Sequence, residues 1–200
     1  MNVGANNETD YGLYFAWGET QGYTAEQVGT DKQFRWSDYK FNPSGDGSTM
    51  SKYNSTDGKT VLDLEDDAVR ANWGGSWRMP TETQFQELLN TTYVTNTFIS
   101  NYQGSGINGR LFTSVANGNT LFIPAAGFAG YGSMYDVGSQ GYVWSSSLSG
   151  SSVKNGRYLD FGSNGVNVLS SDRCSGQSVR GVVDGNYSQD GAEGDDEVVG

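Results

Sequence analysis

The sequence predicts an α+β fold, with two short helices followed by a small antiparallel sheet that has long irregular loops. Three observations lead to this prediction. Helical patterns occur early, at residues 62–73 and 80–89; alternating segments separated by turn residues fill the chain after residue 92; and 29 glycines supply turns throughout. Helices and strands are therefore segregated along the chain.

The first part of the chain is mostly irregular. Residues 11–17 (YGLYFAW) alternate weakly and carry aromatic side chains, which favours a short strand. Residues 18–60 form a long polar stretch in which no helix or strand pattern is visible. A loop of this length in a compact domain needs aromatic anchors such as Trp36 and Tyr39.

The segment 62–73 (LDLEDDAVRANW) predicts the first helix. Acidic residues come early and Arg70 comes late, as the helix dipole prefers. Leu64, Ala68 and Ala71 would share one face, and the pair Gly74–Gly75 would end the helix.

The second helix has a sharper start. Thr81 is an N-cap candidate after Pro80, and Gln84 stands three residues later, which makes a capping box. Phe85, Leu88 and Leu89 would form the apolar face.

Short strands are predicted for the rest of the chain. Their ranges are 110–115 and 120–124, joined through Asn117–Gly118, and then 141–147, 157–161, 166–169 and 177–183. In the segment 157–161 the alternation directs Leu159 and Phe161 inward and Tyr158 and Asp160 outward.

The domain is expected to span residues 1–183. The segment 184–200 holds six acidic residues and no basic one, so we expect it to be a flexible, glycine-rich acidic tail.

The composition excludes several classes of function. The chain has no histidine and one cysteine, which excludes a Ser-His-Asp triad, a Cys-His pair, an HExxH zinc site and an internal disulfide framework. A formal net charge of −11 argues against binding nucleic acid through its phosphates. No apolar run reaches the length of a membrane-spanning helix, so we expect no membrane insertion.

Five segments together resemble a known family, the Fibrobacter succinogenes major paralogous domain of gut Bacteroidetes and their phages. They are residues 10–20 (DYGLYFAWGET), 66–81 (DDAVRANWGGSWRMPT), 122–127 (FIPAAG), 142–147 (YVWSSS) and 177–180 (QSVR). Their order and spacing are similar over about residues 2–183, and the run 66–81 is the most specific.

The resemblance implies a C-type lectin-like fold, related to that of the formylglycine-generating enzyme. It also implies a variable protein of a diversity-generating retroelement, in which a reverse transcriptase rewrites adenines in the last part of the gene. In the family this target lies between the Trp-Ser-Ser and Ser-Val-Arg segments, which here is about residues 145–178. The implied role is recognition of a receptor on a cell surface, and the implied location is a phage virion or a bacterial surface.

Seven positions in this target hold residues that rewriting of asparagine codons produces. The expected ligand-binding face consists of Leu148, Gly150, Tyr158, Asp160, Val168, Arg173 and Cys174. A tyrosine among small and acidic residues resembles an antibody paratope, where tyrosine supplies contact area at low entropic cost. Protein and glycan receptors both remain open as partners, and nothing in the sequence reads as a coiled coil that would set an oligomeric state.

Other signals have simpler interpretations. Cys174 beside Arg173 could be a reactive thiol, but formylglycine chemistry, as the resemblance implies it, uses two cysteines, so we expect an incidental cysteine and no enzyme. The acidic run 65–67 with Asp63 is expected to be a solvated helical turn, without a metal or other cofactor. Glu19 is expected to make structural hydrogen bonds.

The tryptophans of the family segments are expected in the core; they are Trp17, Trp73, Trp77 and Trp144. The alternatives to a diversified binder are a fixed-specificity adhesin or carbohydrate-binding domain and, less favoured, an enzyme related to formylglycine generation.

Overall fold

The computed structural model describes residues 1–183, and the expected tail at 184–200 lies outside the described residues. The fold is mixed, with two short helices and small antiparallel sheets, so the α+β prediction is confirmed at that level. The elements are α1 (Ala68–Trp73), α2 (Glu82–Leu88), β1 (Val94–Ile99), β2 (Gly109–Ser114), β3 (Thr120–Pro124), β4 (Phe128–Gly130), β5 (Ser133–Tyr135), β6 (Gln140–Leu148), β7 (Asn155–Gly162) and β8 (Gly165–Asp172).

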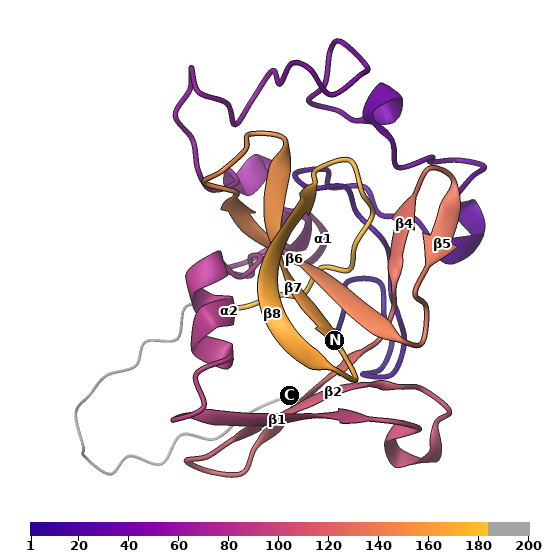
Figure 1. The fold of residues 1–200 in the computed structure, drawn as a ribbon, viewed down its shortest axis with the longest axis vertical. Coiled ribbons are helices and arrows are strands. Elements are labelled where there is room, and N and C mark those ends of the chain that lie inside the picture. The colour runs from indigo at the N-terminus through magenta and orange to yellow at the C-terminus, as the bar shows by residue number, and fades with distance from the viewer. Residues whose placement is uncertain (184–200) are drawn as a thin grey trace.

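Three sheets make up the β structure, in the strand orders β1–β2–β3, β4–β5 and β6–β7–β8, each antiparallel. The hairpin through Asn117–Gly118 is confirmed, as are the strands predicted at 141–147, 157–161 and 166–169. Figure 1 shows β6–β7–β8 at the centre, with β4–β5 on one side and β1–β2–β3 below. Arg110 of β2 ties two sheets together, because its guanidinium donates to the carbonyl oxygens of Gly162 and Gly165.

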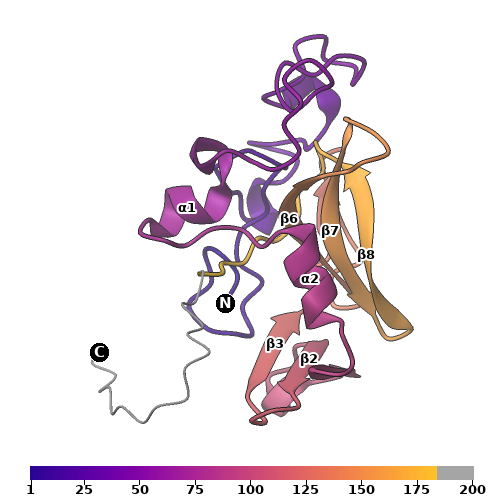
Figure 2. The same cartoon turned by 90° about the vertical axis from the view of Figure 1, so that its left-hand side faces the viewer.

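Helix α2 begins as its sequence predicts. The hydroxyl of Thr81 accepts from the backbone N–H of Gln84, and the Gln84 side chain accepts from the N–H of Thr81. Phe85 is buried on the side that faces β6–β7–β8. Figure 2 shows α2 lying across one face of this sheet.

The prediction of one continuous helix over 62–73 is wrong. A 3₁₀ turn at Leu64–Asp66 is followed by a break at Asp67, and α1 begins only at Ala68. Asp67 has extended backbone and caps the helix, since its Oδ1 accepts from the N–H groups of Val69 and Arg70 at 2.9 and 3.0 Å. A short acidic side chain that caps a helix stops it from continuing toward its N-terminus. Leu64 is consequently exposed rather than part of an apolar face.

The strands predicted at 11–17 and 177–183 form isolated bridges instead of continuous ladders. Phe15 pairs with Gln177, Tyr14 with Tyr23, and Ser178 with Val143. Their backbone groups are therefore satisfied by several different segments, so neither segment becomes a regular strand of one sheet.

The irregular segment 18–60 is confirmed, and its predicted anchors contact the core: Tyr39 is buried and its hydroxyl donates to the carbonyl of Trp17 at 2.6 Å, and Trp36 is partly buried. The preceding segment is tied to the sheet, because the indole N–H of Trp17 donates to the carbonyl of Ser145 at 2.9 Å and that of Trp144 donates to the carbonyl of Phe15 at 2.9 Å. Gly156 allows this approach, because a Cβ there would lie 2.7 Å from the Trp17 ring. Trp17 and Trp144 are fully buried, as expected.

The expectation of core positions for Trp73 and Trp77 is wrong. Their side chains are 37% and 39% exposed, and their rings meet edge to face at 5.2 Å. They stand at the end of α1 and in the loop after it, where no element of residues 1–183 covers them completely.

Candidate functional site

The β6–β7–β8 sheet has two different faces. One face packs under α2 through Val143, Leu159 and Phe161, all of which are buried. The opposite face, which we call the outer face, bears Tyr142, Tyr158, Asp160, Asn167 and Leu169. Side chains of directly paired residues project from the same face, and the register pairs Tyr142 with Asp160, Asp160 with Asn167, and Tyr158 with Leu169.

Aromatic rings form a row across the outer face. Tyr158 stacks on Tyr142 with ring centroids 5.7 Å apart, and Tyr142 contacts Phe128 of β4 at 4.9 Å. Phe128 in turn stacks on Tyr135 of β5 at 5.1 Å. The row ends at Tyr135, which is 43% exposed, so it runs from the core to the surface.

A polar cleft of about 260 Å³ opens at the end of the outer face near the β7–β8 turn. Its lining includes Ser139, Gln140, Asp160, Asn164 and Asn167. These are carboxylate, amide and hydroxyl groups on the rim of a sheet, which can hydrogen-bond a polar ligand.

Asp160 is the charged group of this cleft. Burial raises the pKa of its carboxyl, and the negative charge of Asp136 raises it further. No Lys or Arg of residues 1–183 lies within ion-pair distance of it. The Tyr142 hydroxyl lies 2.7 Å from Asp136 Oδ2 and from Gln140 Oε1, and burial together with Asp136 raises its pKa. An unneutralised carboxylate beside aromatic rings favours ligands that donate hydrogen bonds or carry positive charge.

The structure does not bring the seven predicted positions together. Tyr158 and Asp160 share the outer face, but Tyr158 is only 8% exposed because it packs against Trp144, so its outward exposure was wrongly predicted. Leu148 is partly buried at the far end of β6, and Gly150 is exposed in the loop after it.

Val168 lies on the wrong face for the predicted role. It pairs with Leu159 and packs against the core beneath α2. The two-residue turn Ser163–Asn164 could have revealed this from the sequence, because counting back from it pairs 159 with 168 and 160 with 167. The same count places Asn167 and Leu169 on the outer face, although neither is among the seven predicted positions.

Arg173 was expected on the binding face and is instead fully buried. Its guanidinium donates to the hydroxyl of Tyr39 at 2.9 Å and to the carbonyls of Tyr53, Val153 and Lys52 at 3.2, 2.9 and 3.1 Å. It also lies 4.8 to 5.7 Å from the centroids of four aromatic rings, those of Trp17, Tyr39, Phe41 and Tyr53. Arg173 therefore joins the irregular segment 18–60 to the end of the sheet.

Cys174 is also buried, which contradicts its predicted place on the binding face. Burial raises the pKa of its thiol to about 12, and Asp172 contributes in the same direction. The thiolate is disfavoured, so the neighbouring arginine does not make this cysteine reactive.

Glu19 makes the structural contacts expected of it. The residue is buried, its Oε2 lies 2.8 Å from Lys32 Nζ, and its Oε1 accepts from the backbone N–H of Lys40 at 2.8 Å.

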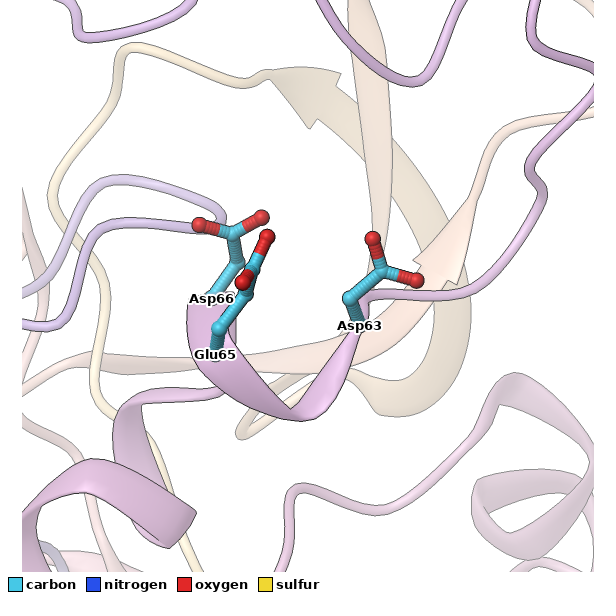
Figure 3. A group of neighbouring side chains, drawn as sticks. All are labelled: Asp63, Glu65 and Asp66. Atoms are coloured by element: carbon cyan, nitrogen blue, oxygen red, sulfur yellow. The ribbon is translucent and has the colours of Figure 1, made fainter.

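The acidic run forms a group of converging carboxylates. Asp63, Glu65 and Asp66 place oxygen atoms within 4.8 Å of one another, and Figure 3 shows the three side chains on the same side of the turn. Asp66 is 2% exposed, so the prediction of a solvated turn is wrong for this residue.

A lysine lies among these carboxylates. Lys52 Nζ is 2.7 Å from Asp63 Oδ2, 2.7 Å from Glu65 Oε1 and 2.6 Å from Asp66 Oδ2. Asp66 also contacts Lys40 Nζ at 2.6 Å and accepts from the Tyr53 hydroxyl. Burial works against ionisation of Asp66, but these hydrogen bonds outweigh it and lower its pKa.

Added Ca²⁺ is expected to leave the melting temperature of the protein unchanged, because the Lys52 ammonium already lies among these oxygens and Lys40 and Lys59 pair with Asp66 and Asp63. The variant Lys52→Met should instead be stabilised by Ca²⁺, since it leaves three converging carboxylates without the central cation. Thermal unfolding with Ca²⁺ or with a chelator measures both, and Lys59→Met, at the more exposed Asp63 pair, is the control. Stabilisation of the unmodified protein by Ca²⁺ would contradict this prediction.

Comparisons with family models, with curated proteins and with solved structures found no match to this chain. Within residues 1–183, none of the helices has the length and apolar character needed to cross a bilayer.

Proposed function

We propose that this protein is a non-catalytic receptor-binding domain with a C-type lectin-like fold, and that it recognises its ligand through the outer face. The face comprises Tyr142, Asp160, Asn167 and Leu169 around the largely buried Tyr158. Gly150 is exposed in the loop after β6, at the other end of the sheet from the polar cleft. The most specific form of the proposal is a variable protein diversified by a retroelement and displayed on a phage virion or a bacterial surface. The ligand would be a protein or glycan on a target cell.

The alternation of buried and exposed side chains along β7 and β8 is the observation that supports this proposal most directly. Leu159 and Phe161 are completely buried beneath α2, whereas the intervening Asp160 lines an open polar cleft. In β8, Asn167 and Leu169 are exposed beside it. Substitution of exposed side chains leaves the core intact, so recognition can change without creating cavities.

A fixed-specificity carbohydrate-binding domain is the second candidate, and the polar cleft favours it. Carboxylate and amide groups of Asp160, Asn164 and Asn167 can hydrogen-bond sugar hydroxyls. The hydroxyl of Tyr142 lies 2.7 Å from Oε1 of Gln140, another lining residue, and so adds a polar group next to this cleft.

Deep sequencing of this gene in its source population separates the two candidates. Diversification is expected to concentrate at the codons for residues 150, 160, 167 and 169 and to spare those for Leu159, Phe161 and Arg173, because the latter side chains are buried. A nearby template copy with adenines at the variable codons should accompany it. Changes scattered evenly over the gene, or equally frequent at Arg173 and Asp160, would argue against a diversified face.

Binding itself can be tested on glycan and cell-surface protein arrays. Once a ligand is found, Asp160→Ala and Asn167→Ala are each expected to weaken binding by about tenfold, which corresponds to about 1.4 kcal/mol per lost polar contact. Their free energies of unfolding should change little. Glu87→Ala, at an exposed position of α2, serves as the control. If Asp160→Ala, Asn167→Ala and the Glu87→Ala control all bound the ligand with the same affinity, the outer face would not be the binding site.

A further inference from the structure

A second concave surface lies on the side of the molecule opposite the outer face. It is a groove of about 550 Å³, which we call the tryptophan groove, lined among others by Trp73, Trp77, Leu88, Leu121, Arg180 and Val182. Figure 2 shows α1, α2 and β3, which contribute to this lining, on the same side of the β6–β7–β8 sheet. Its volume is in the range of small-molecule sites, and its walls are mainly apolar.

The backbone at Gly181 packs against Trp73 and Trp77 and holds the two rings in place. A Cβ at Gly181 would lie 2.4 Å from the Trp73 ring and 2.9 Å from the Trp77 ring, so both indoles rest against the backbone of this glycine. The backbone bridge between Arg78 and Val182 fixes the same segment. The aromatic walls are thus formed before any ligand binds, although the two tryptophans remain 37% and 39% exposed.

Arg180 has the one charged side chain among the described residues that line this groove, and the residue is only 8% exposed. Its Nη1 donates to the Asn2 side chain at 3.0 Å, and within residues 1–183 its Nε and Nη2 have no hydrogen-bond partner. No carboxylate of the described residues lies within ion-pair distance, although Glu8 acts on it from further away. Burial lowers the pKa of Arg180 to about 10, which remains high enough to keep the guanidinium charged at neutral pH.

A buried cation without an anionic partner is costly, and a ligand that supplies the anion recovers part of that cost. The remaining lining is apolar, so the same ligand must also carry an apolar body that covers the indoles and Leu88. A peptide or sugar would leave most of its polar groups unsatisfied against this surface.

We propose that the tryptophan groove binds a free long-chain carboxylate, with the carboxylate at Arg180 and the alkyl chain along Trp73, Trp77 and Leu88. This site is separate from the outer face and does not depend on the function proposed for that face. The tryptophan groove would bind this carboxylate regardless of which ligand the outer face recognises.

The test is calorimetric titration of the full chain with laurate, kept below the concentration at which it forms micelles. Indole fluorescence is recorded in parallel, because Trp73 and Trp77 would contact the chain. Dodecyltrimethylammonium, with the same alkyl length and opposite charge, is the matched probe. The protein carries a net charge of −11, which by itself favours the cation, so a preference for laurate reports the local guanidinium.

Laurate is expected to bind at one site, at least about tenfold more tightly than the cationic probe. Leu121→Glu places a carboxylate on the rim and should weaken laurate binding by about tenfold or more, as should Trp77→Ala. Val115→Glu introduces the same charge at an exposed site outside the groove and should have no effect. Arg180→Gln should abolish the preference for laurate and Arg180→Lys should retain part of it.

Several results would overturn the proposal. They are absence of saturable laurate binding, equal or tighter binding of dodecyltrimethylammonium, and equal laurate affinity in Leu121→Glu and Val115→Glu. Uptake of laurate only when it is embedded in vesicles would also overturn it, since that would indicate a lipid surface instead of a free carboxylate. If the Arg180 variants do not fold, the comparison of Leu121→Glu with Val115→Glu still decides the question.

Discussion

Replacement of Arg173 by methionine is expected to lower the free energy of unfolding by at least about 3 kcal/mol. The guanidinium is fully buried and donates four hydrogen bonds, one to the Tyr39 hydroxyl and three to the backbone carbonyls of Lys52, Tyr53 and Val153. Methionine fills similar space but leaves those oxygens unsatisfied in an apolar environment. Urea unfolding followed by tryptophan fluorescence and circular dichroism measures the loss.

The matched control for this prediction is Arg35→Met. Arg35 is exposed, so this substitution should change the free energy of unfolding by less than about 0.5 kcal/mol. Arg173→Lys should fall between the two, because an ammonium retains the charge but cannot reach four separated acceptors. Equal stability of Arg173→Met and Arg35→Met would show that the buried guanidinium does not hold the irregular segment in place.

The second large effect is expected at Asp67, where alanine should cost about 2–4 kcal/mol of unfolding free energy. One carboxylate oxygen caps α1 at Val69 and Arg70, and the other accepts from the backbone N–H of Met79 at 2.8 Å. Asp67 is 2% exposed, so water cannot replace the lost acceptor easily. The substitution thus removes a helix cap and a link between α1 and the segment that leads into α2.

Asp67→Asn separates these two contributions. An asparagine side chain keeps one oxygen for the helix cap but presents an amide donor toward the Met79 N–H, so its loss of stability should be intermediate. The control is Glu65→Ala. Glu65 lies two residues before Asp67 and its side chain is exposed, so this substitution should change the free energy of unfolding by less than about 1 kcal/mol. If Asp67→Ala were as stable as Glu65→Ala, the helix cap and the hydrogen bond to Met79 would not contribute measurably to the free energy of unfolding.

The prediction for Arg173 bears on how far the C-terminal third can vary. The expected target region, residues 145–178, includes the buried Leu159, Phe161, Arg173 and Cys174 as well as exposed positions. A core residue tolerates few replacements, whereas an exposed one tolerates many. The structure therefore reduces the proposed variable face to fewer positions than the sequence allowed and adds Asn167 and Leu169.

Local sequence signals predicted much of the architecture correctly. The capping box at Thr81 and Gln84, the turn at Asn117–Gly118 and the alternation of Leu159 and Phe161 each depend on residues a few positions apart. Such signals act through backbone geometry within one turn or hairpin, so they can be read from the chain. The α+β class and the confinement of the helices to the first half followed from them.

The burial of individual side chains was decided by contacts between distant parts of the chain. Arg173 is 134 residues from Tyr39, and the Trp17 indole bonds to a carbonyl 128 residues away. No periodicity encodes such pairs, so a polar or charged residue in a loop-like segment reads as exposed even when an irregular segment folds over it. For the same reason Tyr158 was predicted to face solvent and Trp73 to face the core.

The sequence by itself thus determined the α+β class, the start of α2, the main hairpins and the absence of histidine-based chemistry. Only the tertiary structure decided which residues share the outer face, that Lys52 lies among the acidic side chains, and that Arg180 lies in an apolar groove. Secondary structure depends largely on interactions between residues close together in the sequence. A site forms where distant segments come into contact, and the stability of those contacts depends on how their side chains pack and form hydrogen bonds or ion pairs.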